Sequence, residues 1–355
     1  MKPPIFPTTT LSLLLIAAAT PAHAQTITTE YGIEFCTVGA VGNAPVPPPP
    51  PDGGSLLSPS IGRGRVDYEY RIGRTEITTA QYVEFANVAY GVPVLQRHPN
   101  VGPTPYSSGA FIESITGGGG RRYAVSPEPG SAMLPVFGVS WYMAALYCNW
   151  LHNGKSSDPA SLYTGAYDTS TWGYADGQYT DGATHLPGAR FWIPTIDEQI
   201  KAFHYDPNRF GVGQGGYWLN KNMRDIFGQS GPPGVGQTSA YYNPGGGIDP
   251  KRIPLGSYPN EQSPWGLLDT SGGTTEWNEL FGPGSSQIVR RAFGAAAGTS
   301  AASDNIYGTA GAEPFESPLT YGFRLATSIP TPTTTLLLSL PLLLLPRSRR
   351  ESRHS

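Results

Sequence analysis

Glycine and proline interrupt this chain so often that long helices and long strands have little room to form. The 355 residues include 45 glycines and 36 prolines, more than a fifth of the total. Glycine weakens helices and strands, and proline removes a backbone donor and breaks helix interiors. The 20 tyrosines, 13 phenylalanines and 7 tryptophans nevertheless supply enough apolar surface for a core. We therefore expect a single large domain that is rich in ordered loops and low in regular secondary structure.

The charge balance and the cysteine content exclude several classes of protein. Charged residues make up only 14% of the chain and the formal net charge is -3, so no basic field is present to hold phosphates. Nucleic-acid binding is therefore not expected. The two cysteines, Cys36 and Cys148, are too few for a disulfide-dense scaffold or a four-cysteine zinc or iron–sulfur site. Whether they pair with each other stays open, because the sequence does not set their distance.

Residues 1–24 have the layout of a secretory signal peptide. Lys2 precedes an apolar run from Leu11 to Ala19, and Ala22-His23-Ala24 has the small-x-small form of a cleavage site. The apolar run is much shorter than the roughly 20 residues that a membrane-spanning helix needs. We expect signal peptidase to cleave after Ala24 and the rest of the chain to be exported.

Residues 328–355 end the chain with three features in a fixed order. A Pro-x-Pro motif comes first, a leucine-rich stretch follows, and a basic cluster comes last. The residues are Pro330, Pro332, Arg347, Arg349 and Arg350. This tail resembles the bacterial PEP-CTERM sorting signal, although Thr331 stands where that signal usually has Glu. The resemblance implies a transient hold in the membrane, processing by an exosortase-type enzyme, and a location on the cell surface or in the extracellular matrix. An ordinary C-terminal anchor is the alternative.

Between these ends we expect a Pro/Gly-rich leader followed by one domain. The leader spans residues 25–64 and contains the semi-rigid polyproline run at 47–51. The domain spans residues 65–327. Hydrophobic periodicity and helix-capping patterns predict its elements. They are strands near 68–72, 135–139 and 191–193, and helices opened by Thr79, by Ser140, and by Thr195 with Glu198 in a capping box.

Four segments of the domain carry motifs in a recognisable order. They read RIGRTEITTAQYVEF from Arg71, PVFGVSWYMAALYCNWL from Pro135, RFWIPTIDEQ from Arg190 and SPWGLLDTSGGTTEWNE from Ser263, and a closing YGFR ends at Arg324. In this order they resemble the formylglycine-generating enzyme, or sulfatase-modifying factor, family. The resemblance covers roughly residues 65–327 and implies a loop-rich α+β domain related to the C-type-lectin fold.

Several residues of these segments are expected to be structural. Trp141 and Trp277 are expected to anchor the core, because large aromatic side chains usually do so. An arginine in an otherwise apolar framework needs a partner, unless it simply lies on the surface. The expected pairs are Arg190 with Glu198 and Arg324 with Glu276.

The resemblance also implies a chemistry whose residues are missing here. The family's oxidase activates molecular oxygen with a copper ion held by two cysteine thiolates, which are the soft ligands that Cu(I) requires. Those thiolates lie between the Glu-Trp segment and the closing Gly-Phe-Arg. Residues 278–321 of this chain contain no cysteine. Copper and formylglycine-generating activity are therefore not expected.

Calcium is the one cofactor that the resemblance leaves in question. The family's Gly-Asn-x-x-Glu-Trp segment supplies Asn and Glu oxygens to calcium, and Gly273 stands here in place of the Asn. Glu276 with the carbonyls near Gly273 and Thr275 would be a weak calcium site, so an ion pair of Glu276 is the preferred interpretation. No two histidines have the i, i+4 spacing of a zinc site. The internal ones, His185 among them, are expected at the surface or in caps.

The preferred interpretation is an exported, surface-associated protein whose sulfatase-modifying-factor-like domain is catalytically inactive. Its role is then to bind extracellular polysaccharide or peptide. The tyrosine-rich loops at 163–179 and 205–218 are candidate stacking surfaces for sugars, although these tyrosines would serve equally to cover the core. The two alternatives are an oxygen-dependent oxidoreductase with an altered metal site and a structural envelope component.

Overall fold

The structure is a computed structural model that describes most of the chain between the two ends. The described residues are 26–49, 58–90, 109–114, 121–176, 178–182, 184–242, 252–283, 288–293, 304–308, 310–316 and 318–330. Pro330 is the last of them, so the signal peptide with Ala24 and the tail with Pro332 and its arginine cluster lie outside. No helix in these ranges is both long enough and apolar enough to cross a membrane.

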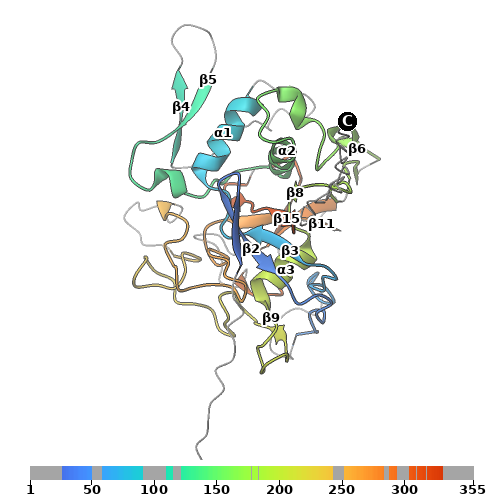
Figure 1. The fold of residues 1–355 in the computed structure, drawn as a ribbon, viewed down its shortest axis with the longest axis vertical. Helices are drawn as coiled ribbons and strands as arrows, with labels where there is room; N and C mark the ends of the chain where they lie inside the picture. The colour runs from blue at the N-terminus through green and yellow to red at the C-terminus, as the bar shows by residue number, and fades with distance from the viewer. Residues whose placement is uncertain are drawn as a thin grey trace, which may run out of the picture.

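A five-stranded antiparallel sheet joins the first and the last described segments (Figure 1). Its strand order is β1-β2-β3-β15-β8. The strands are β1 (Ile27–Glu30), β2 (Ile33–Val38), β3 (Tyr70–Gly73), β8 (Phe191–Trp192) and β15 (Ala326–Ser328). Ile72 of β3 lies opposite Cys36 on one side and Ala326 on the other. The register therefore ties the N-terminal hairpin to the closing strand of the domain.

The first two strands correct the expected start of the domain. The sequence predicts a leader over residues 25–64, but residues 27–30 and 33–38 are strands of the central sheet. Phe35, Cys36 and Val38 are fully buried, because successive side chains of β2 point to opposite faces of the sheet and both faces are covered. The prolines at 45–49 therefore belong to a loop inside the domain and do not precede it.

Three helices are present in the described part of the chain, and each has a side-chain cap at its start. They are α1 (Thr79–Ala89), α2 (Trp141–His152) and α3 (Ile196–His204). Ser140 caps α2 and Thr195 forms a capping box with Glu198 at α3, as predicted. The cap of α1 is Thr78 and not Thr79, since the Thr79 hydroxyl donates to the carbonyl of Leu134 instead.

Two apolar cores lie on the two faces of the sheet. The first contains Phe35 and is covered by α1 and α2, whereas the second contains Cys36 and is covered by α3. Figure 1 shows α1 and α2 on one side of β2 and β3, and α3 on the other. Trp141 and Trp277 are fully buried in the first core, as the sequence predicts.

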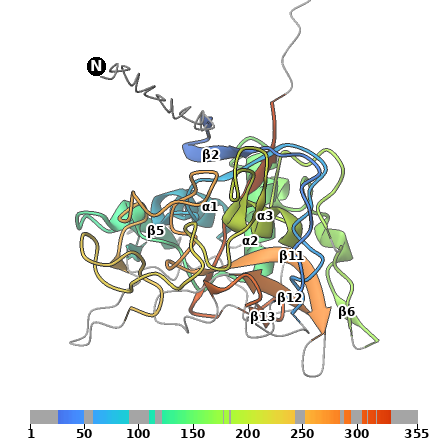
Figure 2. The same ribbon diagram turned by 90° about the horizontal axis from the view of Figure 1, so that it is seen from below.

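A second sheet packs beside the first and carries the Glu-Trp segment. It has the order β13-β12-β11-β14, and Figure 2 shows β11, β12 and β13 side by side. The strands are β11 (Thr275–Pro283), β12 (Ile288–Phe293), β13 (Ala310–Ala312) and β14 (Tyr321–Gly322). Trp277 donates its ring N–H to the carbonyl of Val139 at 2.7 Å, which fastens this sheet to the segment that leads into α2.

Short hairpins and turns make up the remaining regular structure. The hairpin strands are β4 (Ala110–Ser114), β5 (Arg121–Val125), β6 (Tyr174–Ala175), β7 (Gln178–Tyr179), β9 (Tyr205–Asp206) and β10 (Gly216–Tyr217), and the 3₁₀ turns are η2 (Ser131–Met133), η3 (Pro159–Leu162) and η4 (Thr169–Thr171). The strand predicted at 135–139 is wrong. Val136 and Val139 are buried there, but the segment is irregular and Pro135 forms an isolated bridge with Thr78, since proline has no N–H for a ladder.

Candidate functional site

A fully buried ion pair lies between the two sheets. Arg324 follows β14, and its Nε and Nη2 atoms lie 2.6 Å from the two carboxylate oxygens of Glu276 on β11. The guanidinium also donates to the carbonyls of Gly73 and Leu268 and lies 4.9 Å from the ring centroid of Phe203. The expected pair is therefore present. It joins the central sheet, the second sheet and α3 at one point.

The glycine before this pair is imposed by a neighbouring carboxyl group. Gly273 has a φ of +60°, and a Cβ atom placed there would lie 2.3 Å from an oxygen of Glu76. That oxygen accepts the Thr274 backbone N–H at 2.9 Å. Burial, with the nearby charge of Glu276, raises the pKa of Glu76 well above its usual value. The Glu76 carboxyl thus occupies the space that a side chain at residue 273 would need.

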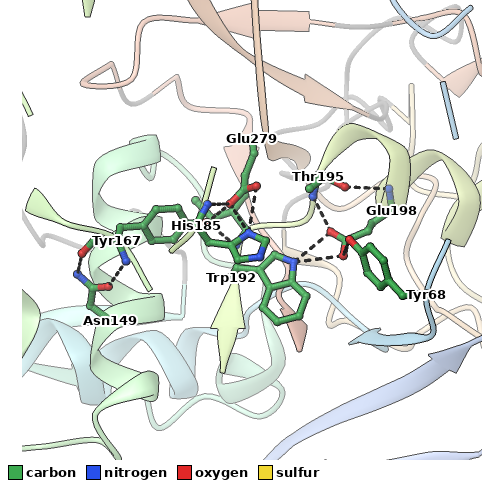
Figure 3. Close-up of polar contacts among 9 residues, drawn as sticks. Tyr68, Asn149, Tyr167, His185, Trp192, Thr195, Glu198 and Glu279 are labelled. Carbon is green, nitrogen blue, oxygen red and sulfur yellow. Dashed lines mark hydrogen bonds and ion pairs between the residues drawn. The ribbon is translucent and has the colours of Figure 1, made fainter. Parts of the chain in front are cut away.

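A second polar network lies around Glu279, on β11 (Figure 3). One Glu279 oxygen accepts the Tyr167 hydroxyl at 2.6 Å and the His185 backbone N–H at 2.8 Å, and it lies 3.0 Å from His185 Nδ1. Burial lowers the pKa of His185, but the hydrogen bond and the charge of Glu279 outweigh burial and the net shift is upward. The His185 ring stacks on Trp192 with centroids 4.6 Å apart. Contrary to expectation, His185 is neither a cap nor a plain surface residue.

The expected partner of Arg190 is wrong. Arg190 pairs at 2.9 Å with Glu30 of β1 and stacks on Tyr31, which belongs to the same hairpin. Glu198 turns back on its own helix instead and accepts the backbone N–H of Thr195. It also accepts the Trp192 ring N–H at 3.0 Å and the Tyr68 hydroxyl at 2.9 Å (Figure 3). These neutral donors satisfy the buried carboxylate without a cation.

An aromatic pocket of about 560 Å³ is formed around β9 and β10. Three separate segments line it, at 44–48, 205–225 and 306–307. Its aromatic lining residues are Tyr205, Phe210, Tyr217, Trp218 and Tyr307. Ligand pockets commonly have about 300–1,000 Å³ and are largely apolar with a few polar groups. This pocket has that character.

The charged residues that line this pocket, Arg209 and Asp225, form an ion pair. Arg209 Nη2 lies 2.6 and 2.8 Å from the two carboxylate oxygens of Asp225. The guanidinium carbon lies 4.6 Å from the ring centroid of Trp218 and 4.9 Å from that of Phe210. The pair is thus held over aromatic rings at the pocket, and the Asp225 side chain is half exposed to solvent.

Two glycines and two tyrosine hydroxyls shape the walls of the pocket. A Cβ at Gly215 would lie 2.1 Å from the Tyr205 hydroxyl oxygen, and a Cβ at Gly216 would lie 2.5 Å from the Phe210 ring. On the opposite wall, the Tyr307 hydroxyl donates to the Pro47 carbonyl at 3.0 Å. The Tyr217 hydroxyl lies 2.8 Å from the Ala44 carbonyl and 2.9 Å from that of Gly64. The proline loop is therefore fastened to the aromatic side.

The two tyrosine-rich loops singled out by sequence end in different environments. The loop at 205–218 lines the pocket. In the loop at 163–179, Tyr167 is buried in the first core and hydrogen-bonds Glu279. Tyr174 is exposed but packs edge-on against Tyr179. The pocket also contains residues 44–48 and 306–307, for which the sequence offered no functional signal beyond the prolines.

Comparison with known proteins identifies the framework. Residues 63–329 match the model of the sulfatase-modifying factor enzyme 1-like domain. The chain belongs to this family. The matched range agrees with the resemblance to this family over residues 65–327, and the α+β fold with long loops is the one expected.

Three solved structures are similar to this member of the sulfatase-modifying factor family. Treponema denticola variable protein 1 is 18% identical, with a TM-score of 0.48, over 86% of this chain and 99% of that one. PvdO from Pseudomonas aeruginosa is 15% identical, with a TM-score of 0.46, over 88% and 100%. CarF is 19% identical, with a TM-score of 0.43, over 74% and 88%. No curated protein matches the chain in sequence.

The residues present do not fit the family's two-thiolate copper centre. Cys36 and Cys148 are free, buried thiols that belong to the two different cores. Burial raises the pKa of Cys36 to about 11 and that of Cys148 well above its usual value. Both are therefore protonated at neutral pH, whereas Cu(I) binds thiolates.

At the candidate calcium position, neighbouring groups already occupy the space next to Glu276. Both carboxylate oxygens of Glu276 already face the Arg324 guanidinium, so a cation would have to displace another positive charge. The Glu76 carboxyl fills the place of the missing Asn side chain. Among the described residues, no group of three or more His, Cys, Asp or Glu side chains is arranged to hold a metal ion. Calcium binding stays a prediction that elemental analysis would test.

Proposed function

We propose that this chain is an exported, surface-associated protein whose sulfatase-modifying-factor-like domain is a non-catalytic binding module. Its ligand is extracellular polysaccharide or peptide. The observation that carries this proposal is the aromatic pocket, because it joins a ligand-sized volume to stacking surfaces and one charged pair. One of its walls is the tyrosine-rich loop at 205–218, one of the two candidate stacking surfaces in the sequence.

The interior of the domain supports binding rather than oxidation. The Arg324–Glu276 pair is fully buried and closed by hydrogen bonds to neighbouring carbonyls. It is therefore placed to hold the sheets together and is out of reach of a substrate. The cysteines that the family's oxidase would use are absent from residues 278–321. The framework of the family thus remains without the groups that would hold its redox metal.

The proposed location rests on the two ends of the chain. The signal peptide at 1–24 and the sorting tail at 328–355 imply signal peptidase and an exosortase-type enzyme as processing partners. Mass spectrometry of the protein from its native host is expected to find Gln25 at the N-terminus and no arginine cluster at the C-terminus. An intact N-terminus in a cytoplasmic fraction would contradict export.

A binding screen tests the function directly. The purified protein is presented to a glycan array and to a peptide library, in parallel with Trp218→Ala, which removes one pocket wall. We expect a ligand that binds the unchanged protein and is lost with Trp218→Ala. The matched control is Tyr241→Ala, which removes a tyrosine that is 61% exposed and does not line the pocket.

Three outcomes contradict the proposal. The first is the absence of any glycan or peptide ligand. The second is a stoichiometric redox metal in elemental analysis of the native protein, which would favour the oxidoreductase alternative. The third is concentration-dependent self-assembly without a ligand, which would favour a structural envelope component.

A further inference from the structure

The polar groups left open in the aromatic pocket point to a particular class of ligand. We infer that the pocket selects uncharged sugar residues of a polysaccharide over both acidic sugars and proline-rich peptide. This inference rests on the proposed binding function and adds the ligand class to it.

Two tyrosine hydroxyls of the pocket already contact backbone carbonyls of the chain itself. Aromatic grooves that bind proline-rich peptides use ring faces together with hydroxyl or ring N–H donors to peptide carbonyls. Here Tyr307 already donates to the Pro47 carbonyl, and Tyr217 lies within hydrogen-bond distance of Ala44 and Gly64 carbonyls. A tyrosine hydroxyl has one proton to give. The chain itself therefore engages two of the three tyrosine hydroxyls that line the pocket, and a peptide in polyproline conformation would have to compete for them.

The two charges that line the pocket have opposite signs and are paired. Among the lining residues, Arg209 and Asp225 carry the formal charges, and they are paired. The pocket therefore has no net charge from its walls. An acidic sugar would gain from Arg209 but would be repelled by Asp225, whose carboxylate lies within 2.8 Å of the same guanidinium. A neutral ligand is not repelled by either charged group.

The Arg209–Asp225 pair contains both a hydrogen-bond donor and a hydrogen-bond acceptor. Arg209 uses Nη2 for Asp225, and the structure records no hydrogen bond of its Nη1 and Nε atoms to the described residues. Asp225 is 52% exposed and accepts only through its oxygens. A donor and an acceptor thus stand side by side. A sugar hydroxyl both donates and accepts, so two adjacent hydroxyls match this pair.

An exposed aromatic side chain also lines the pocket. The Phe210 side chain is 65% exposed at the same pocket, although it is large and apolar. A pyranose ring presents C–H groups on its faces and hydroxyls at its rim. It can therefore cover an exposed aromatic ring and reach the Arg209–Asp225 pair at the same time.

Isothermal titration with three kinds of probe tests this inference. The probes are neutral tetrasaccharides (β-1,4-glucan, α-1,4-glucan and β-1,4-mannan), uronate tetrasaccharides (galacturonate and mannuronate), and a decaproline peptide. We expect at least one neutral tetrasaccharide to bind, and neither uronate nor decaproline to bind more tightly. Phe210→Ala is expected to weaken that binding about three- to tenfold, while Tyr241→Ala leaves it unchanged.

A charge variant makes the selection falsifiable without unfolding the pocket. Asp225→Asn keeps the side-chain shape and removes the negative charge, so Arg209 is left uncompensated. Uronate affinity is expected to rise at least about tenfold relative to that of the best neutral probe, and to fall with added salt. Circular dichroism checks that the variant is folded. An unchanged ratio of the two affinities overturns the role of the pair.

The outcomes separate this inference from the proposed function. Uronate binding as tight as neutral binding, or binding of decaproline in the pocket, overturns the inference and leaves a binding module in place. Neutral binding that survives both Phe210→Ala and Trp218→Ala places the ligand elsewhere and also overturns it. Failure of every probe overturns the inference, whereas the proposed function falls only if the broader glycan and peptide screen is empty as well.

Discussion

Two arginine–carboxylate pairs of this domain each lie over an aromatic ring and differ in their surroundings. Arg324 lies 4.9 Å from the centroid of Phe203 and pairs with Glu276, and Arg209 lies 4.9 Å from the centroid of Phe210 and pairs with Asp225. The first pair is at most 1% exposed, whereas the second is 16% and 52% exposed. The same chemistry therefore fixes the framework in one place and remains available to a ligand in the other.

Burial, and not residue type, distinguishes the pair that stabilises the framework from the pair at the proposed ligand pocket. Arg324 also donates to the carbonyls of Gly73 and Leu268, so its guanidinium is fully engaged within the framework. Arg209 lines a pocket, and its partner Asp225 is half exposed. A buried pair is strongly destabilising when one member is removed, while an exposed pair contributes little to folding.

The largest effect is expected for Arg324→Met. It leaves the Glu276 carboxylate buried without its cation, and removal of one partner of a buried pair costs about 3–5 kcal/mol. Urea unfolding followed by tryptophan fluorescence measures the loss. The double variant Arg324→Met with Glu276→Leu is expected to recover most of it, since an apolar pair carries no desolvation cost. A loss below about 1 kcal/mol would show that the interior pair behaves like the exposed one.

A smaller loss is expected for Gly273→Asn, which restores the residue usual in the family. The new Cβ would lie 2.3 Å from Glu76, and overpacking of a core costs about 1–3 kcal/mol. Adding Glu76→Ala removes the obstructing carboxyl and is expected to raise the melting temperature above that of the single variant. A Gly273→Asn protein as stable as the unchanged one would mean that Glu76 moves aside freely.

The sequence predicts the framework well where the signal is local. The cap at Ser140 and the capping box of Thr195 with Glu198 depend on residues within one helical turn, so the pattern is visible in the chain. The expected pair of Arg324 with Glu276 is present, but it joins residues 48 positions apart. The argument that a charge in an apolar framework needs a partner does not name that partner, and it gave the wrong one for Arg190.

The sequence fails where the partner comes from a segment with no visible pattern. Arg190 pairs with Glu30, which lies in a hairpin that the sequence assigns to a leader. His185 meets Glu279 across 94 positions of the chain, and no spacing rule connects them. The pocket needs the loop at 44–48 to meet residues 205–225 and 306–307. Only the aromatic content of 205–218 could have indicated it.

A pH effect is expected from the Glu279 network, which is intermediate between the two pairs because His185 is 23% exposed and Glu279 is buried. The folded-state pKa of His185 lies above its unfolded value. Its contribution is therefore fully present below the unfolded pKa and is lost as pH rises through the folded one. Melting temperature measured from pH 5 to 9 is expected to decline less in His185→Gln than in the unchanged protein.

His152 provides the matched control for this pH effect. Burial, together with the charge of Arg190, lowers the pKa of His152, so its linkage has the opposite sign. His152→Gln is expected to keep the decline that His185→Gln reduces. Equal pH profiles of all three proteins would mean that the His185–Glu279 contact does not couple to folding.

The smallest effect on stability is expected where the effect on binding is largest, in Arg209→Met. Exposed pairs contribute about 0–1 kcal/mol, so urea unfolding of this variant is expected to stay within that range of the unchanged protein. Met keeps an unbranched apolar stem against Trp218 and Phe210, but it removes the guanidinium donors of a residue that lines the pocket. Titration with the best neutral tetrasaccharide is expected to show binding reduced at least about tenfold, because hydrogen bonds to a charged group contribute about 1.5–3 kcal/mol. If Arg209→Met instead unfolds as readily as Arg324→Met, the two pairs are both structural, and exposure of Asp225 carries no information about the ligand. If it remains stable and binds as before, the Arg209–Asp225 pair is a surface feature that the ligand does not touch.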